Sequence, residues 1–132
     1  MWYLNDKMQV TVTMKNAGNL LFISSERGKM GDDLPYGLTK AAINSLIKGL
    51  ARRGIDYDIR VNGIVPGVTV SDMVGVGEND NLYRKKSIGK RIYLPEEIAE
   101  LAVFLMSDIS GCISGEVIAC DQGNYHQLDD IL

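Results

Sequence analysis

The chain has 132 residues, of which 45% are hydrophobic and 23% are charged, a composition typical of one folded domain. Its 14 basic and 17 acidic residues give a net charge of -3, which argues against a nucleic-acid partner. No apolar run approaches the ~20 residues of a membrane helix. The first residues also lack the pattern of a signal peptide, so we expect a cytoplasmic protein without a membrane partner.

Residue types that bind metals are sparse. The two cysteines, Cys112 and Cys120, form no C-x-x-C pair, and the single histidine, His126, has no cluster of ligands around it. We therefore expect no metal site. Lone cysteines of this kind are typically reduced and partly buried.

The first predicted element is a buried strand. Residues 1–15 contain apolar side chains with a period that fits neither helix nor strand clearly, and residues 16–19 look like a break. The continuous apolar run 20–23 predicts a strand buried on both faces, as in a parallel sheet. This strand ends at Ser24 and Ser25.

A helix is predicted over residues 34–53. Asp33 is its candidate N-cap, and Gly54 ends it. Apolar residues repeat with a period close to 3.6, at Leu38, Ala41, Ala42, Leu46 and Leu50. Ile43 and Ile47 lie off this line, so the helix has a second apolar side.

The second half of the chain predicts two strands, one helix and one long loop. Residues 59–65 and 116–120 are the strands, and residues 95–110 form a helix with acidic groups in its first turn. Residues 68–94 are polar and dotted with glycine. A loop of this length inside a small domain is usually a lid or a binding loop.

Strands that alternate with helices predict an α/β fold with a parallel sheet and right-handed crossovers. Ligands of such sheets bind beyond the carboxyl ends of the strands. The groups at these ends are Ser24-Ser25, Pro66-Gly67 and Asp121-Gln122-Gly123.

Tyr36 and Lys40 are spaced to share one face of the first predicted helix. A nearby ammonium favours the phenolate, so a Tyr–Lys pair can move a proton to or from an alcohol oxygen. Taken alone, the Y-x-x-x-K spacing favours an exposed tyrosine and a solvated lysine, because the spacing occurs by chance in many helices. A strand that ends in two serines shortly before this helix adds a hydroxyl donor for a substrate oxygen.

Several motifs in order resemble the classical short-chain dehydrogenase/reductase family, from about Met14 to Gly123. The serine strand Leu20-Leu21-Phe22-Ile23-Ser24-Ser25 and the helix start Tyr36-Gly37-Leu38-Thr39-Lys40-Ala41-Ala42 are similar to the family's catalytic segments. Ile59-Arg60-Val61-Asn62-Gly63-Ile64-Val65-Pro66-Gly67 is similar to its I-R-V-N-x-[IV]-x-P-G motif. Pro95-Glu96-Glu97-Ile98-Ala99, Phe104-Leu105-Met106-Ser107-Asp108, Ser114-Gly115 and Asp121-Gln122-Gly123 resemble later signatures.

The resemblance implies a Rossmann-like, doubly wound parallel sheet and three catalytic residues. Tyr36 would be the general acid/base, and Lys40 would promote its ionisation and bind the ribose of the nicotinamide. Ser25 would orient the substrate, with Ser24 as the alternative. The reaction would transfer a hydride between the cofactor, NAD or NADP, and a carbonyl or secondary-alcohol substrate.

The resemblance also implies a cofactor-binding segment after the second strand. Pro66, Gly67, Thr69 and Ser71 would contact the nicotinamide end of the cofactor, and residues 68–94 would cover the substrate. Neither the substrate's identity nor the choice between NAD and NADP follows from these residues.

The chain departs from the family in lacking the glycine-rich T-G-x-x-x-G-x-G loop. We therefore expect residues 1–132 to be one partial domain, the C-terminal catalytic half, with about three strands and little or no activity alone. Asn16-Ala17-Gly18 imitates an N-terminal motif of the family but lies too close to Ser25 to be it.

An exposed strand edge and a helix with two apolar sides favour a homo-oligomer. Two alternatives to the enzyme remain. One is a non-catalytic oligomerisation module with the same fold, and the other is an unrelated flavodoxin-like binding domain.

Overall fold

The computed structural model describes residues 17–124 of the chain. Its strands are β1 (Gly18–Ile23), β2 (Ile59–Pro66) and β3 (Val117–Cys120), and its helices are α2 (Pro35–Gly54) and α3 (Pro95–Met106). Three short 3-10 helices are η1 (Glu26–Gly28), η2 (Ile55–Tyr57) and η3 (Asp108–Ser110). The predictions for residues 1–15 lie outside the described residues.

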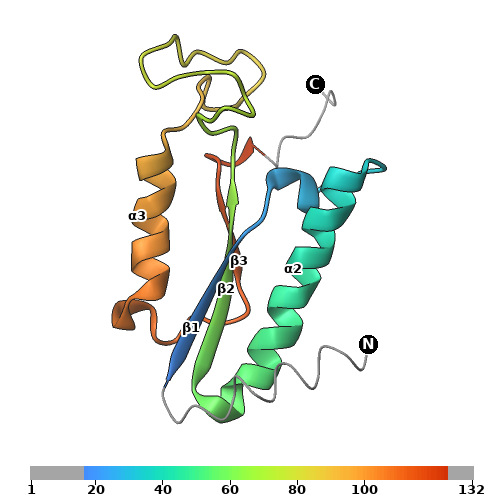
Figure 1. Cartoon of the computed structure of the whole chain (residues 1–132), viewed down its shortest axis with the longest axis vertical. Helices are drawn as coiled ribbons and strands as arrows, with labels where there is room; N and C mark the ends of the chain where they lie inside the picture. Colours follow the sequence, from blue (N-terminus) through green and yellow to red (C-terminus); the bar gives the residue numbers. More distant parts are fainter. Residues whose placement is uncertain (1–16, 125–132) are drawn as a thin grey trace.

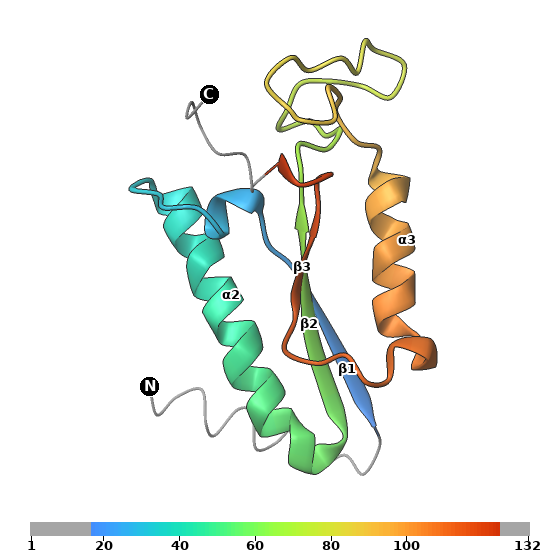
Figure 2. The same cartoon turned by 180° about the vertical axis from the view of Figure 1, so that it is seen from behind.

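The three strands form one parallel sheet in the order β1-β2-β3. Leu20 lies beside Val61 on one edge of β2, and Ile64 lies beside Ile118 on the other edge. Helices α2 and α3 lie on opposite faces of this sheet (Figures 1 and 2). The structure thus confirms the predicted α/β fold with a parallel sheet and flanking helices.

The central strand β2 supplies side chains to two cores. Val61 packs with Ile47 and Ala51 of α2 on one face, and Ile64 packs with Leu105 of α3 on the other. This alternation follows from the period of two along a strand. A helix on each face therefore buries almost the whole of β2.

Strand β1 is less buried than its sequence predicted. Leu20 is 46% exposed and Ile23 is 51% exposed, so the prediction of a strand buried on both faces is wrong. Within residues 17–124, β1 pairs only with β2, so its other edge has no partner strand there. The strand also begins at Gly18, within the segment that predicted a break.

Both helices differ from their predicted limits. Helix α2 begins at Pro35 after Leu34, which has extended backbone and makes no side-chain cap bond, so the prediction of Asp33 as N-cap is wrong. A proline in the first turn needs no amide partner, so this start is stable without a cap. Helix α3 ends at Met106 rather than near residue 110, because η3 replaces its last turn.

The side of α2 that faces the sheet also differs from the line of apolar residues in the sequence. Ile47 is fully buried against β2, whereas Leu46 is 40% exposed. The second line of apolar residues, through Ile43 and Ile47, thus faces the sheet. Leu46, from the line expected to face the core, is therefore among the exposed apolar groups of α2.

Among residues 17–124, no helix is both long enough and apolar enough to span a membrane. The same residues contain no group of three or more acidic, cysteine or histidine side chains that could hold a metal ion. Cys120 is partly buried, which raises the pKa of its thiol, but Cys112 is exposed, contrary to the prediction for both cysteines.

Candidate active site

A cavity of about 810 Å³ lies at the carboxyl ends of β1 and β2. All of the residues predicted for catalysis and cofactor binding line this one cavity: Ser24, Ser25, Tyr36, Lys40, Pro66, Gly67, Thr69 and Ser71. Parallel strands end at one edge of the sheet, so segments far apart in sequence meet there.

The two serines differ in what their hydroxyls contact. Ser24 is buried, and its Oγ donates a hydrogen bond to the Lys40 carbonyl at 3.3 Å. The Ser25 Oγ accepts the Arg27 amide at 3.3 Å and caps η1. Because accepting a bond leaves its proton free, Ser25 is the serine that can donate to a ligand oxygen.

Tyr36 and Lys40 lie one turn apart on α2. The Lys40 Nζ lies 5.6 Å from the centroid of the Tyr36 ring, and it donates a hydrogen bond to the Ile23 carbonyl at 3.0 Å. This bond to the end of β1 holds the ammonium beside the ring. Tyr36 itself is 45% exposed, so its hydroxyl is accessible to a ligand in the cavity.

Residues 24–34, here called the serine loop, connect β1 to α2, and they pack tightly on α2 at Gly28. A Cβ placed on Gly28 would lie 2.6 Å from the Lys40 carbonyl carbon, and Asn44 Nδ2 donates to the Gly28 carbonyl at 2.9 Å. Only glycine permits this backbone approach. The distance between Ser25 and the Tyr36–Lys40 face therefore depends on Gly28.

We expect Gly28→Ala to push the serine loop away from α2 and to reduce hydride transfer about 100-fold, the usual cost of a misplacement near 1 Å. The transfer rate and the thermal unfolding midpoint measure the effect. Gly49→Ala is the control, because a Cβ at Gly49 meets no atom within 4 Å. Equal rates for the two variants would contradict the role of Gly28.

An ion pair that the sequence analysis missed closes the loop between Ser25 and Tyr36. Arg27 donates to both carboxylate oxygens of Asp32, at 2.5 and 2.7 Å. The pair raises the pKa of Arg27 and lowers the pKa of Asp32. Asp32 also accepts the Leu34 amide at 3.0 Å, just before α2 begins. The sequence does contain a signal for this ion pair, because two opposite charges lie five residues apart on either side of Gly28 and Gly31.

Residues 68–94 form the predicted long loop, here called the lid, beyond the carboxyl end of β2 (Figure 1). Its two ends are tied together, because Tyr93 accepts a backbone bond from Val70 and donates one to Val68, both at 2.9 Å. Burial raises the pKa of the Tyr93 hydroxyl. The Thr69 hydroxyl donates to the Gly67 carbonyl at 2.9 Å, which holds Thr69 at the cavity.

Two further contacts hold the lid. Arg91 pairs with Glu97 at the start of α3, and this contact lowers the pKa of Glu97. Asn124 accepts the Ile88 amide at 3.1 Å and donates to Glu26 at 2.9 Å, so it links the lid to η1. The sequence gives no signal for Asn124, because its partners are distant along the chain.

The cavity fits one end of a dinucleotide cofactor. Hydroxyls of Ser25 and Thr69 and the ammonium of Lys40 are the hydrogen-bonding groups expected around a ribose and a carboxamide. A pyrophosphate needs backbone amides at a glycine-rich helix start, and the chain lacks the T-G-x-x-x-G-x-G motif. The residues present therefore fit the nicotinamide end alone.

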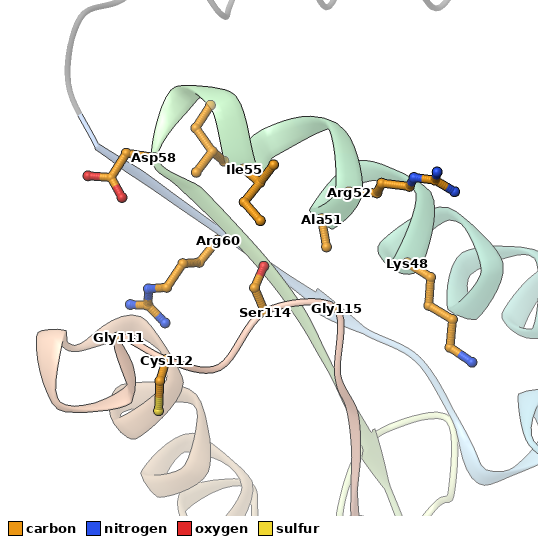
Figure 3. A pocket seen from close by; sticks show the side chains of 11 residues that line it. Lys48, Ala51, Arg52, Ile55, Asp58, Arg60, Gly111, Cys112, Ser114 and Gly115 are labelled. Carbon is orange, nitrogen blue, oxygen red and sulfur yellow. The ribbon is translucent and has the colours of Figure 1, made fainter.

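A second cavity of about 430 Å³ lies at the opposite end of the sheet, between the end of α2 and residues 111–115 (Figure 3). Arg60 lines it, but its guanidinium donates to the carbonyls of Leu105, Ser107 and Ser110 at 2.9 to 3.1 Å. Arg60 thus caps the carboxyl end of α3, and none of the residues predicted for catalysis or cofactor binding lines this second cavity.

Comparison with known proteins identifies the class. A family model described as enoyl-(acyl carrier protein) reductase matches residues 6–125. The chain is 37% identical over 111 residues to an acetoacetyl-CoA reductase of Rhizobium meliloti, a match that covers 81% of this chain and 45% of the relative. It is 38% identical over 112 residues to a 3-oxoacyl-[acyl-carrier-protein] reductase of Chlamydia trachomatis, with the same two coverages.

The solved structures agree. A 3-oxoacyl-[acyl-carrier protein] reductase of Brucella melitensis superposes with a TM-score of 0.75 at 29% identity, over 89% of this chain and 46% of that one. The chain belongs to the short-chain dehydrogenase/reductase family of oxidoreductases, whose members use NAD(P). It spans about half the length of the curated relatives that it matches.

Proposed function

We propose that this chain is the catalytic half of an NAD(P)-dependent oxidoreductase that reduces a carbonyl compound or oxidises a secondary alcohol. The observation that supports this most is the meeting of Ser25, Tyr36 and Lys40 at one cavity beside Pro66-Gly67. Bound NAD(P)H would supply the hydride. The same assignment makes residues 68–94 the segment that covers the substrate.

The side chains of the cavity bind the substrate, transfer the proton and bind the cofactor. Ser25 donates a hydrogen bond to the substrate oxygen and so fixes the carbonyl in the cavity. The Tyr36 hydroxyl gives its proton to this oxygen as negative charge develops there, and takes it back in the reverse reaction. The Lys40 ammonium stabilises the phenolate left on Tyr36 and donates to the cofactor ribose. Thr69 and Ser71 contact the carboxamide end.

The isolated chain should bind the cofactor weakly, because a site without a phosphate loop holds only the nicotinamide end. Calorimetric titration of the chain with NADH and NADPH tests this. We expect weak binding that disappears in Lys40→Gln and persists in Lys48→Gln, an exposed lysine further along α2.

Binding that is unaffected by Lys40→Gln would contradict the assigned cofactor site. Micromolar binding by the wild-type chain would contradict weak binding, and would mean that a second chain supplies the phosphate contacts.

A homo-oligomer is the proposed assembly, and a non-catalytic oligomerisation module is the alternative function. The exposed apolar groups Leu20 and Ile23 on β1 and Leu46 on α2 favour association. Light scattering should give a mass above that of one chain, and a monomer would count against this.

We place the protein in the cytoplasm, where the free thiols of Cys112 and Cys120 stay reduced.

A further inference from the structure

Five charged side chains line the candidate active site: Glu26, Arg27, Asp32, Lys40 and Arg84. Four of these have partners within residues 17–124. Arg27 binds Asp32, Asn124 donates to Glu26, and Lys40 donates to the Ile23 carbonyl.

Arg84 differs from the other four. It lies in the lid, it is half-buried, and its guanidinium makes no hydrogen bond or ion pair with any of the described residues. A guanidinium is always charged and carries five N–H donors in a planar fork that matches an oxyanion. At Arg84 none of these donors is used by another described residue, so they are available to an anionic ligand in the cavity.

The backbone of Arg84 is held in place. Its amide donates to the Lys90 carbonyl at 2.9 Å, and its carbonyl accepts the Ser87 amide at 3.2 Å. The neighbouring amide of Ile88 donates to Asn124 at the end of the sheet. The fold therefore holds the backbone from which the Arg84 side chain reaches the cavity.

Apolar side chains line the same cavity, among them Val70, Met73 and Val74 of the lid and Ile98 of α3. A ligand that suits both features has an apolar stem and one anionic end. The planar guanidinium binds the two oxygens of a carboxylate or phosphate in parallel.

We propose that Arg84 binds an oxyanion of the substrate, so that the carbonyl compound reduced at Tyr36 carries a carboxylate or phosphate group at its other end. This inference rests on the proposed function, because it takes the cavity as the substrate site. Arg84 would then select anionic carbonyl compounds over neutral ones of the same length.

The test uses two probes, 4-oxopentanoate and its methyl ester, which share the oxo chain and differ in charge and by one methyl group. Binding to the isotope-labelled chain is followed by amide shifts in NMR spectra, without cofactor. We expect the acid to bind more tightly than the ester, and Arg84→Gln to weaken the acid at least about tenfold while leaving the ester unchanged. Arg84→Lys should keep part of the affinity.

Lys85→Gln is the matched control, because it removes one positive charge from the adjacent exposed residue of the lid. An equal loss in Lys85→Gln would show a diffuse charge effect and overturn the proposal. No binding of the acid by the wild-type chain would also overturn it. Thermal unfolding of each variant shows that the fold is retained.

Nicotinamide mononucleotide distinguishes a substrate oxyanion from a cofactor phosphate. A loss of its binding in Arg84→Gln, with the oxo acid unaffected, would assign Arg84 to the cofactor instead. The two proposals fail separately. Arg84-dependent binding of the acid, together with cofactor binding that is indifferent to Lys40→Gln, would refute the enzyme alone, whereas Tyr36-dependent transfer that is indifferent to Arg84 would refute the oxyanion site alone.

Discussion

Tyr36→Phe is expected to reduce hydride transfer by about 10²- to 10⁴-fold, the usual contribution of a positioned general acid. Phenylalanine keeps the ring beside the Lys40 ammonium, 5.6 Å from the ring centroid, and removes only the hydroxyl. Tyr36 is 45% exposed, so the fold should be unaffected. The rate of NADPH oxidation with an excess of carbonyl substrate measures the change.

Tyr57→Phe is the control for this substitution. Tyr57 lies in η2 and is 50% exposed, so it matches Tyr36 in exposure but is not among the residues that line the cavity. Its loss should leave the rate unchanged. Similar rates for the two variants would show that the Tyr36 hydroxyl moves no proton in the reaction.

Leu105→Ala should lower the free energy of unfolding by about 2–5 kcal/mol. Leu105 is fully buried and packs with Ile64 of β2, Tyr93 of the lid and Ile98 of α3. Its removal opens a cavity where α3, the sheet and the lid meet. Denaturant unfolding followed by circular dichroism measures the difference.

Met106→Ala provides the comparison, because Met106 is the next residue of α3 and is 48% exposed. We expect a change within about 0.5 kcal/mol for it. A loss for Leu105→Ala no greater than this would mean that α3 is not packed on β2 as described.

Local patterns were sufficient to predict most of the fold. The helical spacing of apolar residues placed α2, and the continuous apolar run 20–23 placed β1, because these signals depend on near neighbours. Burial of β1 was predicted wrongly for a different reason. Exposure of Leu20 and Ile23 depends on what lies beside and over the strand, which a short apolar run does not specify.

The sequence predicted those residues of the candidate site that lie in recognisable motifs. The sequence placed Ser25, Tyr36 and Lys40 together because each lies in a recognisable segment. It could not reveal the contact of Gly28 with the Lys40 backbone or the bond between Asn124 and Glu26, which join segments 12 and 98 positions apart. Those contacts exist only once the chain is folded.

Transfer of deuterium from NADH or NADPH, labelled at the carbon that gives the hydride, to the alcohol product is the most direct test of the proposed chemistry. Mass spectrometry detects such a product even after few turnovers, which suits a chain that binds its cofactor weakly. We predict a singly deuterated alcohol with the wild-type chain, and none above background with Tyr36→Phe. Equal labelling by the wild-type chain and by Tyr36→Phe would contradict hydride transfer at the Ser25–Tyr36–Lys40 site.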